Sequence, residues 1–154
     1  MLRVVHLLSA TVWVGGTVAL VFVGVPAIRG LEGEARATAM RALGRRWRPL
    51  GWGAMGVAIG SGLWLTELHG AFHAGAFSTD FDRTLIVKSV LVALLCVGAL
   101  IHDYVLGPRL QRELREGEAR APLTRRRLVW VGWFNFSLTL AVPILGAVAL
   151  TYLG

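Results

Sequence analysis

The sequence predicts an all-α integral membrane protein, a four-helix bundle with its N-terminus and C-terminus outside. Three observations lead to this fold class: the composition, the number of long apolar stretches, and the placement of the arginines. The 154 residues are 55% hydrophobic and 16% charged, with a mean hydropathy of +0.62, whereas soluble domains carry roughly 25% charged residues. The apolar stretches are continuous rather than alternating, which excludes a closed β-barrel.

Four stretches are long enough to cross a bilayer, which takes about 20 helical residues, and together they form a single transmembrane domain, residues 1–154. The first is too long for the apolar core of a signal peptide, and no A-x-A cleavage site follows it. Short connections between successive spans favour an up-down arrangement. The expected spans are residues 4–28, 50–68, 85–106 and 128–153.

Two polar segments are expected to prolong the spans as helices. Between Glu34 and Trp47 apolar residues recur three and four apart, which predicts a helix that either extends the second span or lies on the lipid headgroups. From Leu110 to Glu118 the third span can continue in the same way, until Gly117 and Pro122 break the helix. No sequence repeat, linker or low-complexity tract is evident.

The basic residues give the expected orientation. Thirteen of the sixteen Lys and Arg residues fall in loops 29–49 and 107–127, which the positive-inside rule makes cytoplasmic. Loop 69–83 and both termini are then periplasmic or extracellular, as in a multi-pass protein of a bacterial-type inner membrane. The partner of the arginines is the lipid bilayer; no recognition motif for nucleic acid accompanies them.

Small residues in the second span indicate close helix packing. Gly56 and Gly60 have the spacing that lets two helices approach closely in lipid. The alternatives are packing within the chain and a homodimer.

Ionisable residues at membrane depth are the candidates for chemistry, since hydrocarbon disfavours them strongly. One group is expected at the outer face and a second near the inner end of the third span, about 21 Å from Lys88 along the helix axis. The outer candidates are His6, Glu67, His69, His73 and Lys88, and the inner candidates are His102, Asp103 and Asn135. For Lys88 the alternative is snorkelling to the interface or pairing with Asp82.

The outer group has the chemistry of a metal site. Imidazole and carboxylate are good ligands for Cu(II), Zn(II) or haem iron, and His69 and His73 are four residues apart, on one face if that segment is helical. The alternative is a polar loop that uses histidine at the interface. No motif of a hydrolase or of a phosphoryl-transfer enzyme is present.

Several short motifs resemble a known family. The stretch from His6 through Trp13 to Gly16, the run Leu85-Ile-Val-Lys88, and the run from His102 to Arg109 are similar to segments of CopD/PcoD-type copper-resistance membrane proteins. Asn135 in the last span also fits. The chain resembles a minimal, four-span member, and the resemblance implies copper as the metal.

The opening residues and Lys88 resemble, more weakly, HemJ-type membrane proteins of protoporphyrinogen oxidation. That resemblance implies haem b as the cofactor, with His6 and Lys88 as axial ligands and Trp13 two turns from His6. The chain would then be an oxidoreductase, whereas a copper-handling protein would not be an enzyme.

The sequence therefore predicts a CopD-like inner-membrane protein that handles copper at a histidine and acid site on its periplasmic face. The metal ligands are expected to be His6, Glu67, His69 and His73. Such a site would exchange copper with a periplasmic carrier protein. Haem b binding is the alternative function, and a purely structural membrane subunit is a third.

Overall fold

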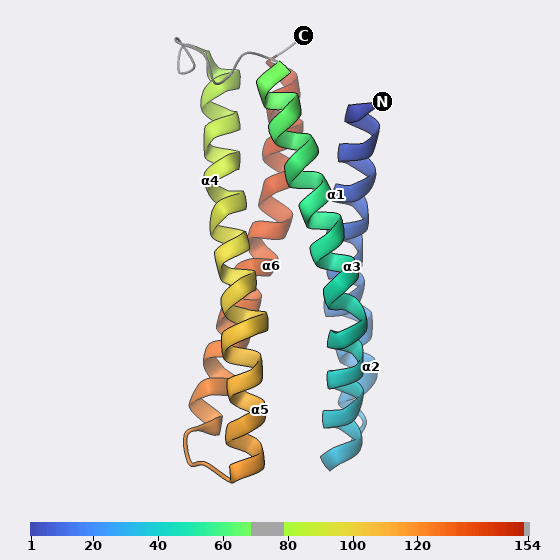
Figure 1. The fold of residues 1–154 in the computed structure, drawn as a ribbon, viewed down its shortest axis with the longest axis vertical. Coiled ribbons are helices and arrows are strands. Elements are labelled where there is room, and N and C mark those ends of the chain that lie inside the picture. The colour runs from blue at the N-terminus through green and yellow to red at the C-terminus, as the bar shows by residue number, and fades with distance from the viewer. Residues whose placement is uncertain (69–78, 153–154) are drawn as a thin grey trace. The chain divides into compact units, whose positions relative to one another are not determined.

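The described residues, 1–68 and 79–152 of a computed structural model, are almost entirely helical and contain no strand. The all-α fold class is therefore confirmed. The chain divides into two compact units, Met1–Ala76 and Phe77–Gly154. Each unit is a hairpin of two long antiparallel helical segments (Figure 1).

Unit 1 consists of α1 (Leu2–Ala19), the π-helical turn η1 (Leu20–Gly24), α2 (Val25–Arg29) and α3 (Gly33–Leu68). The first three elements form one continuous helical segment, because the residues that join them keep right-handed helical dihedral angles. Gly33 opens α3 at a φ of 52°, which glycine adopts without strain. The helix predicted from Glu34 to Trp47 is confirmed as the first part of α3.

Trp47 fills the contact between α1 and α3. Its ring lies so close to Gly16 of α1 that a Cβ atom there would overlap with it, and the indole also packs against Gly51 of its own helix. Small residues permit this close approach, which supplies much of the stabilisation between helices in lipid. Gly56 and Gly60 have no such neighbour within 4 Å, so the close approach in unit 1 does not use them, and the homodimer through them stays a prediction.

Unit 2 consists of α4 (Asp80–Leu100), the π-helical turn η2 (Ile101–Leu106), α5 (Gly107–Glu116) and α6 (Ala121–Thr151). A capping box starts α4: the Thr79 hydroxyl accepts from the backbone N–H of Asp82, and the Asp82 carboxylate accepts from Thr79. Gly117, at a φ of 68°, ends α5. The prediction that Gly117 ends this helix is confirmed.

A proline follows each π-helical turn by two residues. The N–H groups of Val25 and Gly107, the residues before Pro26 and Pro108, donate to carbonyls five residues back rather than four. A proline ring has no N–H and collides with the carbonyl four residues before it in a regular α-helix. The wider π turn moves that carbonyl aside, so each helix continues through its proline.

Among the described residues, three helical segments are long and apolar enough to cross a membrane: Leu2–Arg29, Asp80–Glu116 and Ala121–Thr151. These contain the first and third expected spans and the fourth as far as Thr151. The second expected span, 50–68, is the C-terminal part of α3; its glycines make it less apolar than the others, and its crossing of the membrane stays a prediction. Most large apolar side chains on the helices are exposed, as for helices that face lipid.

Candidate functional site

His6 is held by the helix opposite it in unit 1. Its Nδ1 atom lies 2.8 Å from the carbonyl oxygen of Ala58 and 3.2 Å from the hydroxyl of Ser61, both on α3. A carbonyl oxygen can only accept, so Nδ1 carries the proton and donates. In a neutral imidazole the lone pair is then on Nε2, the ring atom with which a histidine of this tautomer can bind a metal.

The sequence of α3 provides the room for this imidazole. Ala58 and Ser61 are buried, three residues apart on the face toward α1. Gly62 lies beside the ring: a Cβ atom there would come within 3.0 Å of His6 Cε1 and 3.3 Å of Nδ1. The Ser61 hydroxyl donates to the carbonyl of Val57 at 2.6 Å, which leaves its oxygen directed so that it can accept from His6.

Of the other predicted metal ligands, Glu67 is on the same helix. Glu67 is exposed in the last turn of α3, five residues beyond Gly62, which is about 7.5 Å along the helix axis. His69 and His73 lie outside the described residues. Within residues 1–68 and 79–152, no three His, Cys, Asp or Glu side chains are close enough to hold a metal ion.

Trp13, expected to line a haem site, is half-buried on α1. It lies seven residues, or two helical turns, from His6 and on the same face of the helix. Its carbonyl accepts from the Thr17 hydroxyl at 2.8 Å. The second expected haem ligand, Lys88, belongs to unit 2.

Lys88 packs against α6. Its Nζ atom would lie 3.2 Å from a Cβ atom at Gly146, so the side chain extends across the contact between the two helices. Asp82, considered as its partner from the sequence, instead accepts from Thr79 in the capping box of α4, with 2.7 Å between Asp82 Oδ2 and Thr79 Oγ1.

Two of the three inner candidates, His102 and Asn135, lie where α6 packs against α4 and η2. His102 and Asp103 bind each other through Nδ1 and Oδ1 at 2.9 Å, within the π-helical turn η2. The His102 ring faces Gly132 of α6, at 3.5 Å from a Cβ position there. Asn135, three residues further along α6, lies directly over Gly98 of α4. The structure therefore brings this predicted group together.

A shared arrangement of the two units was not anticipated from the sequence. The first helical segment of each unit contains one of the predicted site residues, His6 or Lys88. Ten residues later comes a glycine that packs against a side chain of the second helix, and ten residues after that comes a proline. A π-helical turn precedes the proline in both. The residues are His6, Gly16 and Pro26 in unit 1, and Lys88, Gly98 and Pro108 in unit 2. The sequence signal for this arrangement is the equal spacing of the three positions. Only the glycine and the proline are the same residue type in both units.

A comparison with protein-family models finds one match. The family model for CopD, copper resistance protein D, matches residues 41–150. This is well over half of the chain. The chain belongs to the CopD family.

The part of the chain that matches the CopD family model begins within α3 and ends near the end of α6. It includes Lys88, Asn135 and the His102–Asp103 pair, whereas His6 on α1 precedes the matched residues. No curated protein and no solved structure matches the chain, and the weaker resemblance to HemJ-type proteins finds no support in these comparisons. Family membership and the membrane-length helices make the chain a copper-resistance membrane protein.

Proposed function

We propose that this CopD-family protein handles copper at a site at the end of unit 1 that contains His6 and the C-terminus of α3. Copper is the cargo of the site rather than a resident cofactor. The observation that carries the proposal is the bond from His6 Nδ1 to the Ala58 carbonyl. Metal-binding histidines in proteins commonly donate their second ring nitrogen in this way, which fixes the ring and makes the ligand nitrogen more basic.

The proposed ligand set combines His6 Nε2 with the acid at the end of α3 and the two histidines that follow it in the sequence. Glu67 is in the last turn of that helix, and His69 and His73 follow it in the chain. Neutral imidazole and carboxylate together suit Cu(II). The set contains no thiolate or thioether, so we do not expect it to prefer Cu(I).

We propose that this site faces the periplasm and that the protein lies in a bacterial-type inner membrane. The support is the arginine content of loops 29–49 and 107–127, because basic loops are retained in the cytoplasm. Both termini and loop 69–83 would then be periplasmic, and a soluble copper carrier of that compartment would be the exchange partner.

The test is Cu(II) binding by the purified full chain, measured by equilibrium dialysis and electron paramagnetic resonance. His6→Ala should weaken binding at least about tenfold, because the variant loses a ligand whose second nitrogen is already fixed. Acidification should weaken binding by the wild type, since only neutral imidazole binds a metal. His102→Ala is the matched control and should bind as the wild type does.

Equal Cu(II) affinity of the wild type and a variant with alanine at positions 6, 69 and 73 would contradict the proposal. The visible spectrum tests the haem alternative on the same sample. The copper proposal expects a colourless protein without copper, whereas a Soret band that disappears in both His6→Ala and Lys88→Met would support haem b as the ligand.

A further inference from the structure

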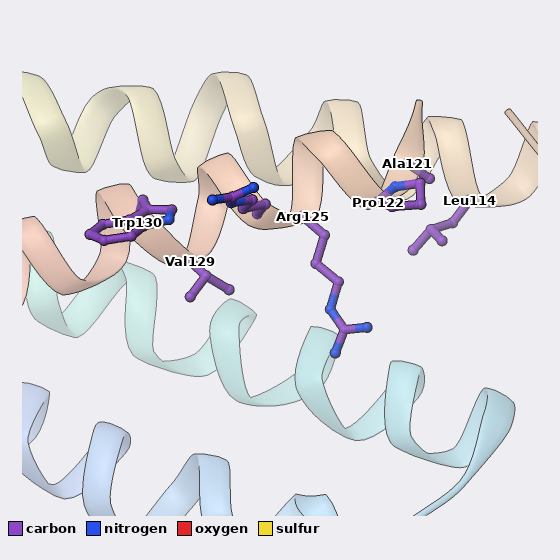
Figure 2. A pocket seen from close by; sticks show the side chains of 7 residues that line it. Leu114, Ala121, Pro122, Arg125, Val129 and Trp130 are labelled. Carbon is purple, nitrogen blue, oxygen red and sulfur yellow. The ribbon is translucent and has the colours of Figure 1, made fainter. Parts of the chain in front are cut away.

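A groove lies on unit 2 where α5 turns into α6, and none of its lining residues belongs to the proposed copper site. Its volume is about 440 Å³, within the range of roughly 300–1,000 Å³ that small-molecule sites occupy. The lining residues are Leu114, Ala121, Pro122, Arg125, Arg126, Val129 and Trp130 (Figure 2).

The spacing of these residues on α6 explains the groove. Four of them lie three, four, seven and eight residues after Pro122, so the five together occupy one face of the helix. Leu114 closes the groove from α5. The five residues on α6 are Pro122, Arg125, Arg126, Val129 and Trp130.

Glu113 is buried at the turn between α5 and α6. Its side chain is 1% exposed, and its Oε1 atom accepts from Arg109 Nε at 2.7 Å. This turn lies beyond the apolar part of the long helix Asp80–Glu116, which at 37 residues exceeds what a membrane requires. The Glu113 carboxylate is thus paired with Arg109 of its own helix.

The groove itself is cationic. Within the described parts of the chain, neither Arg125 nor Arg126 forms an ion pair, and Glu113, the buried acid of this turn, is bonded to Arg109. Two arginines that line one groove and form no ion pair favour an anion that offers several oxygens, above all a phosphate.

The same groove continues into apolar surface. The arginines end at Arg127, and an apolar run begins at Leu128, so the groove crosses from headgroup level to hydrocarbon level. Val129 and Trp130 lie about one turn deeper than the arginines, and Trp130 is 67% exposed. Tryptophan at this level is typical of the membrane interface, where one end of the indole is wet and the rest is apolar.

We propose that this groove binds one anionic phospholipid, with the phosphate between Arg125 and Arg126 and an acyl chain along Val129 and Trp130. A free phosphate ion would use the two arginines and leave the apolar part of the groove in water. A neutral lipid would leave the positive charge uncompensated. An anionic lipid compensates the positive charge of the arginines and also covers the apolar part of the groove. Basic pockets beside membrane helices on the cytoplasmic side characteristically recognise such headgroups.

The experiment is native mass spectrometry of the full chain in detergent, with phosphatidylglycerol and phosphatidylcholine of identical acyl chains added in turn. The wild type should retain phosphatidylglycerol in preference. Arg125→Gln combined with Arg126→Gln should weaken that binding at least about tenfold, since each basic residue near the surface contributes roughly one kcal/mol. Arg45→Gln combined with Arg46→Gln removes the same charge from an exposed pair on α3 and should bind as the wild type does.

A second variant tests the apolar part without a change of charge. Val129→Trp places a bulky ring in the groove and should reduce phosphatidylglycerol binding, whereas Val97→Trp, at a similarly exposed valine of α4, should not. Unchanged binding by the Arg125/Arg126 or Val129 variants would overturn the proposal. So would an equal loss in the Arg45/Arg46 control, or displacement of the lipid by excess inorganic phosphate, which would indicate a site for small anions.

Discussion

His6 owes its orientation to a carbonyl group on the facing helix. The backbone of Ala58 accepts the Nδ1 proton at 2.8 Å, and no substitution of a side chain can remove that acceptor. The residue that can be changed is Gly62, because its missing Cβ leaves the space that the imidazole occupies. The predicted ligand therefore depends on a residue with no side chain at all.

We expect Gly62→Ala to weaken Cu(II) binding severalfold without removing any ligand. The new Cβ atom would lie 3.0 Å from His6 Cε1, which is closer than ordinary van der Waals contact, so the ring must shift away from Ala58. Equilibrium dialysis measures the loss, and electron paramagnetic resonance should report a changed copper environment.

Gly60→Ala is the matched control, since nothing lies within 4 Å of a Cβ atom at Gly60. It should bind copper as the wild type does. If both variants bound equally well, the contact between Gly62 and the imidazole would have no part in holding the ligand.

At the scale of elements, glycines on each long helix lie opposite a large or polar side chain of its partner. Gly98 of α4 lies under Asn135 of α6, and Gly132 of α6 lies under His102. The two contacts differ in tightness: a Cβ atom at Gly98 would overlap with Asn135, whereas one at Gly132 would lie at an ordinary 3.5 Å from His102 Nε2.

Gly98→Ala should therefore destabilise the pairing of α4 and α6 by about 1–3 kcal/mol, the usual effect of overpacking. Gly132→Ala should be tolerated, because the added methyl group meets only a normal contact and alanine favours the helix. Thermal unfolding of the purified protein in one detergent, followed by circular dichroism, compares the two. Equal midpoints would contradict the packing of Asn135 over Gly98.

At the scale of the whole molecule, the distribution of the arginines predicts the orientation of the protein in the membrane. Loop 69–83 contains one arginine, Arg83, whereas the loops on either side of it in the chain contain thirteen basic residues together. The difference in the free energy of transferring these loops across the membrane sets the orientation of the helices during insertion.

Single cysteines tested with a membrane-impermeant maleimide should reveal this orientation. The free thiol of Cys96 is first removed by Cys96→Ala. Ser78→Cys should then react in intact spheroplasts, and Arg120→Cys should react only in inverted membrane vesicles. The reverse pattern would place the proposed copper site in the cytoplasm.

The amino-acid sequence by itself determined the helices. Hydrophobic length predicted segments that became α1, α4 and α6, periodicity predicted the polar first part of α3, and Gly117 predicted the end of α5. These features are local, because a helix satisfies its backbone hydrogen bonds within its own segment and must do so in lipid. Short motifs were also enough to indicate the CopD family, which the family model confirms.

Only the tertiary structure decided which groups meet. The bond from His6 to Ala58 spans 52 residues of sequence, and nothing in the periodicity of either helix indicates that partner. The same holds for Asn135 over Gly98, since hydrophobic periodicity identifies a face of a helix but neither its neighbour nor its register. The π-helical turns before Pro26 and Pro108 likewise arise from how the backbone avoids a proline ring. Contacts between distant residues depend on the packing of side-chain shapes, and this information appears only when the helices are paired.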